Sequence, residues 1–343
     1  MIKKQFNNGI QYILLLLDKS AESFCYYNHH YDNCELMPLD ILQKCMDFCK
    51  KNNLNASILY GKNRLPAIYT KLLGSFPHIK IKPYYPDEIF KEDDIAIIDF
   101  KGDYTVFKNI PPNANLNLII RLKLAEIKSL AVSLEHFDNK FKRLNVIYKD
   151  ILTASETVLN NFRLDLLYVQ EVLFNILSRN SGIEFSLATD RIILTEMNNC
   201  NAGITHFTIA PNGKAYICPG FYYSDPENSI GLLENGINIK NQRLLNRDHA
   251  PICRVCDCFQ CKRCVYMNKI STLEVNTPSH EQCVVSHHER NLSGELLQRF
   301  QRRNRYTNFA NIPALYYLDP FDLIKRNENL SLYDNINMKN QKI

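Results

Sequence analysis

Five cysteines fall between Cys253 and Cys264, and this short run restricts the possible fold more than any other stretch of the chain. Three pairs, 253/256, 258/261 and 261/264, have two residues between them. Two thiolates at that spacing can converge on one metal ion across a tight turn. Charged residues interrupt the run, so it does not form an apolar core face, and adjacent pairs of this kind bridge poorly as disulfides. The run therefore predicts metal binding.

Three further cysteines flank the run, two before it and one after it. The predicted metal ligands are Cys200, Cys218, Cys253, Cys256, Cys258, Cys261, Cys264 and Cys283. Eight thiolates suffice for two sites of four sulfurs each, holding either zinc or iron–sulfur clusters. His280, His287 and His288 lie close to Cys283 in sequence. One of them could replace a thiolate, but we expect all three to be exposed.

The composition is that of a soluble protein of about two domains. Hydrophobic residues make up 45% and charged residues 22% of the 343 residues. The net charge of +5 is a mild excess without a basic cluster, which argues against nucleic-acid binding. The apolar run at 12–17 is too short for a membrane span and ends at Asp18 without a cleavage site. We expect a cytoplasmic protein, whose reduced thiols remain available for metal.

Strand and helix patterns alternate through the first part of the chain. Strands are expected at 12–17, 56–60, 79–82, 95–100, 116–122 and 144–148, and helices at 38–51, 67–73, 125–137 and 156–177. Strands joined by helical crossovers form a parallel sheet. A complete eight-unit barrel needs about 250 residues, so the expected fold class is α/β with a partial, six-unit (β/α) barrel of the TIM type.

The pattern changes near Gly182 to short strands, turns and cysteines. Residues 205–209 and 214–217, joined by Pro-Asn-Gly, predict a hairpin. We therefore expect a barrel domain at 1–190, a small cysteine-rich metal-binding domain at 191–326, and a polar tail at 327–343.

The cysteine pattern resembles the SPASM domain of radical S-adenosylmethionine (SAM) peptide maturases. That domain has a cysteine, a gap, Gly-x4-Cys, a dense group of cysteines and one last cysteine. Here Cys200, Gly213 to Cys218, the run from Cys253 and finally Cys283 follow that order. The strand–helix order before residue 190 also resembles the partial barrel of that superfamily. Within it, the sequence is most similar to the CXXX repeat peptide maturases.

The resemblance implies two auxiliary [4Fe–4S] clusters, with zinc as the alternative metal. Carried over by position, Cys200, Cys218 and Cys264 would join one cluster, and Cys253, Cys256 and Cys283 the other. Cys258 and Cys261 would complete one cluster each, in an order left open. The family modifies a ribosomally synthesised precursor peptide, so the implied partners are a cysteine-rich peptide and a companion modification protein.

The N-terminal part departs from the superfamily, which has CxxxCxxC after its first strand. Here only Cys25 and Cys34 stand in that place, as candidate cofactor ligands, with His29 and His30 between them. The turn expected to bind the amino group of SAM reads Gly-Lys-Asn-Arg-Leu-Pro at 61–66, with two cations and no acidic residue. Like charges repel, so this turn disfavours an ammonium group. Both departures argue against radical generation from SAM.

Several alternatives stay open from the sequence. Cys45 and Cys49 share a helix face with apolar residues, and core packing is the better interpretation than metal binding. The aromatic stretch 24–27 fits either a substrate-lining loop or packing at a strand end. The leading hypothesis is maturation of a cysteine-repeat peptide. The alternative is a non-catalytic protein that binds a peptide or partner and has structural metal sites, so whether the chain is an enzyme stays open.

Overall fold

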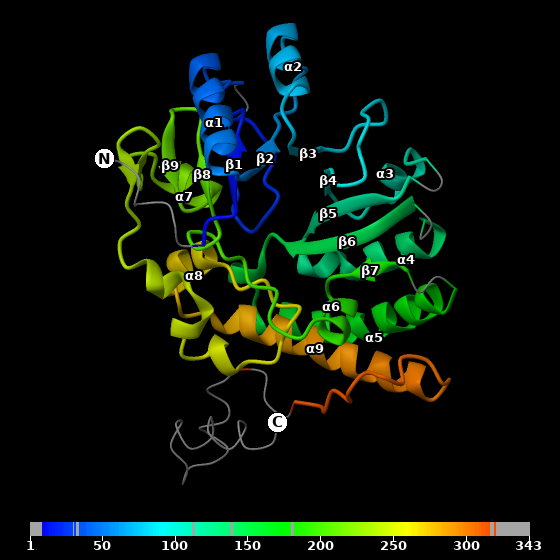
Figure 1. Ribbon diagram of the computed structural model, residues 1–343. Helices are drawn as coiled ribbons and strands as arrows, with labels where there is room; N and C mark the ends of the chain where they lie inside the picture. The colour runs from blue at the N-terminus through cyan, green and yellow to red at the C-terminus, as the bar shows by residue number, and fades with distance from the viewer. Residues whose placement is uncertain are drawn as a thin grey trace. The chain divides into compact units, whose positions relative to one another are not determined.

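The computed structural model describes residues 9–29, 31, 34–111, 114–137, 140–179, 182–315 and 319, with only the backbone at 136 and 137 (Figure 1). The chain forms two compact units, each discontinuous in sequence. Unit 1 comprises Met1–Asp99, Leu116–Arg121 and Asn201–Asn246, and unit 2 comprises Phe100–Asn115, Leu122–Cys200 and Arg247–Ile343. The sequence-based boundary near residue 190 stays a prediction about independently folding domains. The expected polar tail at 327–343 lies outside the described residues.

Unit 1 is built on a mainly parallel sheet. Its strands are β1 (Tyr12–Leu16), β2 (Asn55–Leu59), β3 (Ile79–Pro83), β4 (Ile95–Asp99), β5 (Leu116–Leu122), β8 (His206–Ile209), β9 (Lys214–Tyr216), β10 (Gly231–Leu232) and β11 (Gly236–Ile237). They lie in the order β11-β10-β9-β8-β1-β2-β3-β4-β5. The neighbours from β8 to β5 are parallel, and β9, β10 and β11 are antiparallel additions at one edge. The predicted parallel sheet is confirmed, while its closure into a partial barrel stays a prediction.

Strand β1 is buried on both faces, as its continuous apolar sequence predicts. Ile13, Leu15 and Leu17 pack in one core cluster with residues of α1 (Leu39–Asn52) and α2 (Ala67–Gly74). Leu14 and Leu16 pack in a second cluster on the other face, with residues of α7 (Pro219–Ser224). Figure 1 shows α1 beside β1. Because successive side chains of a strand point to opposite faces, one apolar run serves both clusters.

The helix thiols Cys45 and Cys49 belong to the first of these clusters. Their exposed fractions are 0% and 1%, and burial raises the pKa of each to about 12. A thiol held in its neutral form among apolar side chains is a poor metal ligand. Core packing, expected from the sequence, is confirmed.

Unit 2 consists mainly of helices around a short parallel pair of strands, β6 (Phe141–Tyr148) and β7 (Glu184–Phe185). Its other elements are α3 (Thr105–Lys108), η1 (Leu124–Glu126), α4 (Ile127–Phe137), η3 (Ile151–Thr153), α5 (Glu156–Arg179), α6 (Thr189–Ile193), η5 (Arg247–His249), η6 (Cys253–Val255), α8 (Val265–Thr272) and α9 (His280–Gln301). Helix α5 packs against α4 and α9, and Figure 1 shows α9 running along α5. None of the helices in the described ranges has the length and apolar character to cross a membrane.

Candidate functional site

The loop after β1, residues 18–36, is fixed at both ends by the carboxylate of Asp18, which is 1% exposed. Asp18 Oδ1 accepts hydrogen bonds from the backbone N–H and hydroxyl of Ser20 at 2.9 and 3.0 Å, and from the Glu35 N–H at 3.2 Å. Asp18 Oδ2 accepts from the Cys34 thiol at 3.1 Å. Burial and this carboxylate both raise the pKa of Cys34. The contact favours the thiol, which is not the form that binds metal.

The turn after β2 brings Gly61 against the same carboxylate. A Cβ built on Gly61 would lie 2.2 Å from Asp18 Oδ2, so only glycine leaves room for Asp18. The next residue, Lys62, pairs with Glu22 of the loop at 2.9 Å, so its charge is partly neutralised. Arg64 in the same turn is exposed. The two cations of this turn were apparent from the sequence, whereas the contact between Gly61 and Asp18 was not.

The two predicted cofactor ligands of this loop differ in burial: Cys25 is half-buried and Cys34 is exposed. Within the described ranges, neither is part of a group of three metal-binding donors within 4.8 Å of one another. His29 Nε2 lies 2.6 Å from the Ala21 carbonyl oxygen, and His30 falls outside the described residues. The cofactor role of Cys25 and Cys34 stays a prediction.

An aromatic stack fills the middle of the loop. The His29 ring lies on the ring of Tyr223, with centroids 4.0 Å apart, and Tyr27 and Tyr31 stack on Tyr223 at 5.6 and 5.8 Å. Phe24 meets Tyr27 edge-on at 6.0 Å. The Tyr223 hydroxyl donates to the Lys19 carbonyl at 3.0 Å, which joins α7 to the loop. The stretch 24–27 is therefore packed at the strand end, as one of the two sequence interpretations proposed.

Arg121, at the end of β5, reaches this loop from the sheet. It is 4% exposed, and its Nη2 donates to the Tyr27 carbonyl at 3.1 Å and to Asn28 Oδ1 at 2.5 Å. The register places Asp99 of β4 opposite Arg121, yet no ion pair of Arg121 occurs among the described residues. Arg121 Nε, the Tyr27 hydroxyl and His29 Nδ1 are buried, and none has a hydrogen-bond partner within the described ranges. Buried polar groups are normally paired, so these three atoms are unusual among the described residues.

The structure places seven of the eight predicted metal ligands in unit 2. Cys253, Cys258 and Cys264 are buried, and Cys200, Cys256, Cys261 and Cys283 are half-buried. The eighth, Cys218, belongs to unit 1, where it precedes α7. None of the twelve cysteines, all of which lie in the described part of the chain, forms a disulfide.

One group of donors in this region converges closely. Within the described ranges, Cys256, Cys258 and His287 form the one group of three or more candidate ligand atoms that lie within 4.8 Å of one another. Their chemistry, two thiols and an imidazole, fits a soft metal ion such as zinc. Both cysteines were predicted as ligands from the sequence; the resemblance assigned Cys256 to the cluster with Cys253 and Cys283 and left the place of Cys258 open.

The expected exposure of His287 and His288 is wrong. Their exposed fractions are 3% and 7%, whereas His280 is exposed, as expected. Both residues lie on the inner side of α9, a long helix that the sequence analysis did not anticipate. Its many polar residues hid the apolar pattern that normally reveals a buried helix face. His280 instead forms ion pairs with Asp319 and Glu156 at 2.6 and 3.2 Å.

A charged clamp holds the Cys256-Asp257-Cys258 segment against α9. Arg290 donates from Nε and Nη2 to the two oxygens of Asp257, at 2.8 and 2.6 Å, and Arg191 adds a third contact at 3.1 Å. Burial alone would raise the pKa of Asp257, but the two guanidinium groups hold it at about 2. Arg290 lies three residues after His287 and therefore on the same helix face. The clamp thus positions both thiols over the imidazole.

The thiols of this region differ in pKa. Hydrogen bonds from the Cys258 thiol and from His287 hold the pKa of Cys256 well below its ordinary value, against the opposing effect of burial. Burial raises the pKa of Cys253 and Cys261 to about 12. Cys256 is therefore the thiol of this region that most readily becomes a thiolate, the form that binds metal.

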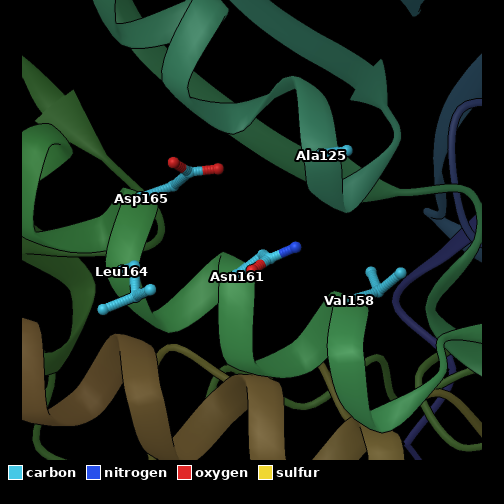
Figure 2. A pocket seen from close by; sticks show the side chains of 5 residues that line it. All are labelled: Ala125, Val158, Asn161, Leu164 and Asp165. Carbon is cyan, nitrogen blue, oxygen red and sulfur yellow. The ribbon is translucent and has the colours of Figure 1, made fainter.

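Two hollows in unit 2 lie apart from the cysteines. One, of about 300 Å³, lies between η1 and α5 and is lined by Ala125, Val158, Asn161, Leu164 and Asp165 (Figure 2). The other, of about 260 Å³, is lined by residues of α5 and α9, including His288. Figure 2 shows Asn161 and Asp165 as the polar side chains of the first hollow. Neither hollow brings together a nucleophile and a base, so neither is a candidate active site.

Comparisons with known proteins give a likeness in structure but none in sequence. No protein-family model matches the sequence, and no curated protein matches it. Among solved structures, the fold is similar to that of SuiB from Streptococcus suis, crystallised with its precursor peptide SuiA. The TM-score is 0.45 and the sequence identity 13%, over 79% of this chain and 75% of that chain. A likeness of this size does not by itself assign a function.

Proposed function

We propose that the protein acts in the maturation of a ribosomally synthesised peptide and binds a cysteine-rich precursor at the loop after β1. The observation that carries this proposal is the set of three buried polar atoms, on Tyr27, His29 and Arg121, that have no hydrogen-bond partner among the described residues. The order of the cysteines, which resembles that of SPASM-domain maturases, supports the choice of a peptide as ligand. A companion protein that carries out part of the chemistry belongs to the same proposal.

The energetics of Arg121 favour an anionic or carbonyl-bearing ligand. A buried cation is costly unless it is paired, and a buried donor without a partner costs about 1–3 kcal/mol. A peptide offers both kinds of partner, because its backbone carbonyls accept hydrogen bonds and its carboxylates pair with guanidinium. Tyr31, which is 39% exposed at the edge of the rings around Tyr223, adds an aromatic surface on which a side chain of the peptide can stack.

The metal centre has a supporting role in this proposal. The resemblance implies two [4Fe–4S] clusters, and zinc is the alternative for the same thiols. Cys256, Cys258 and His287 are the residues that would hold metal, which would supply a soft Lewis acid there. Reduced thiols require a reducing compartment, so we place the protein in the cytoplasm.

Replacing Tyr27 by phenylalanine should weaken precursor binding up to about tenfold without lowering the melting temperature. The change removes one hydroxyl that has no partner in the described structure, so folding loses no hydrogen bond. A hydrogen bond to a ligand is worth about 1 kcal/mol, and each 1.4 kcal/mol corresponds to tenfold in affinity. Calorimetric titration with the synthetic peptide of a neighbouring cysteine-repeat reading frame measures this effect.

Arg121→Lys should weaken precursor binding further than Tyr27→Phe does. Arg243→Lys is the matched control, because Arg243 is an exposed arginine of the same unit. Equal affinity in wild type and Tyr27→Phe would show that the hydroxyl does not contact the peptide, and a lower melting temperature of Tyr27→Phe would show that the hydroxyl has an internal role. A genome without a short cysteine-repeat reading frame near the gene would count against the choice of substrate.

A second candidate function, peptide or partner binding without catalysis, is favoured by the contact between Asp18 and Cys34. A radical SAM site needs three ligands that leave one iron of a cluster open to the cosubstrate. Here the Cys34 thiol donates a hydrogen bond to a buried carboxylate, and His29 Nε2 already contacts a backbone carbonyl. In this candidate the loop receives the peptide, and the metal of unit 2 is structural.

The isolated protein should produce little or no 5′-deoxyadenosine from SAM and dithionite. Two cysteines in the loop after β1 leave one iron of an open cluster without a protein ligand. The measurement compares wild type with Cys25→Ala and Cys34→Ala by chromatography of the products. Robust product in wild type that disappears in either variant would make the protein a radical enzyme with an unusual ligand set.

A further inference from the structure

The spacing of the donor atoms in unit 2 distinguishes a single metal ion from an iron–sulfur cluster. The ligand atoms of Cys256, Cys258 and His287 lie within 4.8 Å of one another. Ligands of one tetrahedral zinc ion, at about 2.0–2.3 Å from the metal, lie roughly 3.3–3.8 Å apart. In a [4Fe–4S] cluster each ligand binds a different iron, so the ligands stand farther apart than on one ion. The three donors therefore fit a single ion better than separate corners of a cluster.

Cys261 is our candidate for the fourth ligand, because two residues separate it from Cys258; its sulfur lies outside the group of three donor atoms within 4.8 Å of one another and would have to approach it on metal binding. Its N–H donates to the Cys258 carbonyl at 2.9 Å, in the tight turn that two intervening residues allow. Cys261 packs with Cys256 against the same apolar cluster. Its thiol is also hydrogen-bonded by Ser286, the neighbour of His287. Cys261 thus contacts both the thiol segment and the helix that carries the imidazole.

The surroundings hold these residues in place from two sides. The amide of Gln260, which is 3% exposed, donates to the Ser286 carbonyl at 2.6 Å and fixes the 258–261 turn on α9. The clamp between Asp257 and Arg290 fixes the preceding segment on the same helix. A site whose ligands are held by neighbouring hydrogen bonds is preorganised for metal.

We propose that Cys256, Cys258, Cys261 and His287 bind one zinc ion in a tetrahedral site of three thiolates and one imidazole. This site takes the place of one of the two four-cysteine clusters that the resemblance implies. It leaves Cys200, Cys253, Cys264 and Cys283 of unit 2 outside the zinc site. The inference is independent of peptide binding, because metal content and coordination are measured without a peptide.

Metal analysis of the full chain, purified without oxygen, tests the proposal. We expect one zinc per chain, and X-ray absorption at the zinc edge should show three sulfurs at about 2.3 Å and one nitrogen at about 2.0–2.1 Å. His287→Asn should lose most of the zinc, whereas His288→Asn, at a neighbouring buried position of α9, should keep it. His287→Cys should restore zinc and change the shell to four sulfurs, which a purely structural histidine would not do.

Four outcomes would overturn the proposal. They are wild-type zinc bound by four sulfurs, zinc content unchanged in His287→Asn, loss of iron rather than zinc in that variant, and a chain that binds no zinc even when zinc is added. The His287→Cys variant keeps the test valid if His287→Asn fails to fold.

Discussion

Replacing Cys256 by alanine is expected to unfold the cysteine run while the sheet of unit 1 stays folded. The thiol belongs to the converging donor group, and its loss removes a metal ligand. A structural zinc site contributes on the order of 10 kcal/mol of folding free energy, most of which the variant would lose. Hydrogen exchange followed by mass spectrometry should show rapid exchange in peptides spanning 253–264 and α8. Peptides from β1 and β2 should exchange as slowly as in wild type.

Cys49→Ala is the matched control for this experiment. Cys49 is also a buried thiol, but it packs in the apolar core of unit 1, so its loss should cost only about 1 kcal/mol. Its effect should be confined to unit 1 and independent of metal. If Cys256→Ala left exchange in the cysteine run unchanged, the run would be stable without metal. Loss of both units together would show that they do not fold independently.

Acidification from pH 7.5 to 4.5 is expected to remove about 3 kcal/mol of stability from unit 1 through His206 alone. Burial lowers the pKa of His206 from 6.5 to about 4 in the folded protein. The unfolded chain therefore binds a proton at a pH at which the folded chain does not. Above pH 6.5, His206 is neutral in both the folded and the unfolded state and costs no stability. As the pH falls from 6.5 toward 4, only the unfolded chain gains this proton, so the free energy of unfolding decreases.

The variant His206→Phe isolates this effect. His206 is 8% exposed and stacks on Tyr12 of β1, with ring centroids 4.5 Å apart, and phenylalanine preserves that stack. Denaturant unfolding at both pH values should show that the variant loses about 3 kcal/mol less than wild type on acidification. The exposed His249, changed to Phe, controls for removing a histidine in general. Equal pH dependence in wild type and His206→Phe would mean that His206 is solvated and titrates normally.

Local patterns in the sequence were enough for most of the parallel sheet. The apolar run at 12–17 predicts a strand buried on both faces, and β1 occupies that place between β8 and β2. The alternation of strands and helices predicts parallel neighbours, which pair as expected from β1 to β5. The turn at 211–213 predicts the β8–β9 hairpin, and Gly213 has the positive φ that such turns require. These features depend on neighbouring residues, so the sequence carries them directly.

The cysteine run was also recognisable as a group in the sequence, because its spacing constrains the backbone locally. The residues that lie beside those cysteines in the folded chain could not be predicted. His287 was expected to be exposed, yet α9 buries it together with charged residues that find partners far away in the chain. Glu289 accepts a hydrogen bond from Tyr148 at 2.8 Å, and Arg290 pairs with Asp257. Such pairs make a buried helix face look polar in sequence.

The sequence by itself determined the longer strands, from β1 to β6, and the clustering of thiols in the run from Cys253 to Cys264, since periodicity and spacing act over a few residues. Tertiary structure alone decided that β8 pairs with β1, that Cys34 donates to Asp18, and that His287 joins Cys256 and Cys258. Each of these contacts joins segments distant in sequence, and each depends on how whole elements pack. Side-chain pairing across such distances leaves no periodic signal in the chain, because either partner alone is an ordinary polar residue.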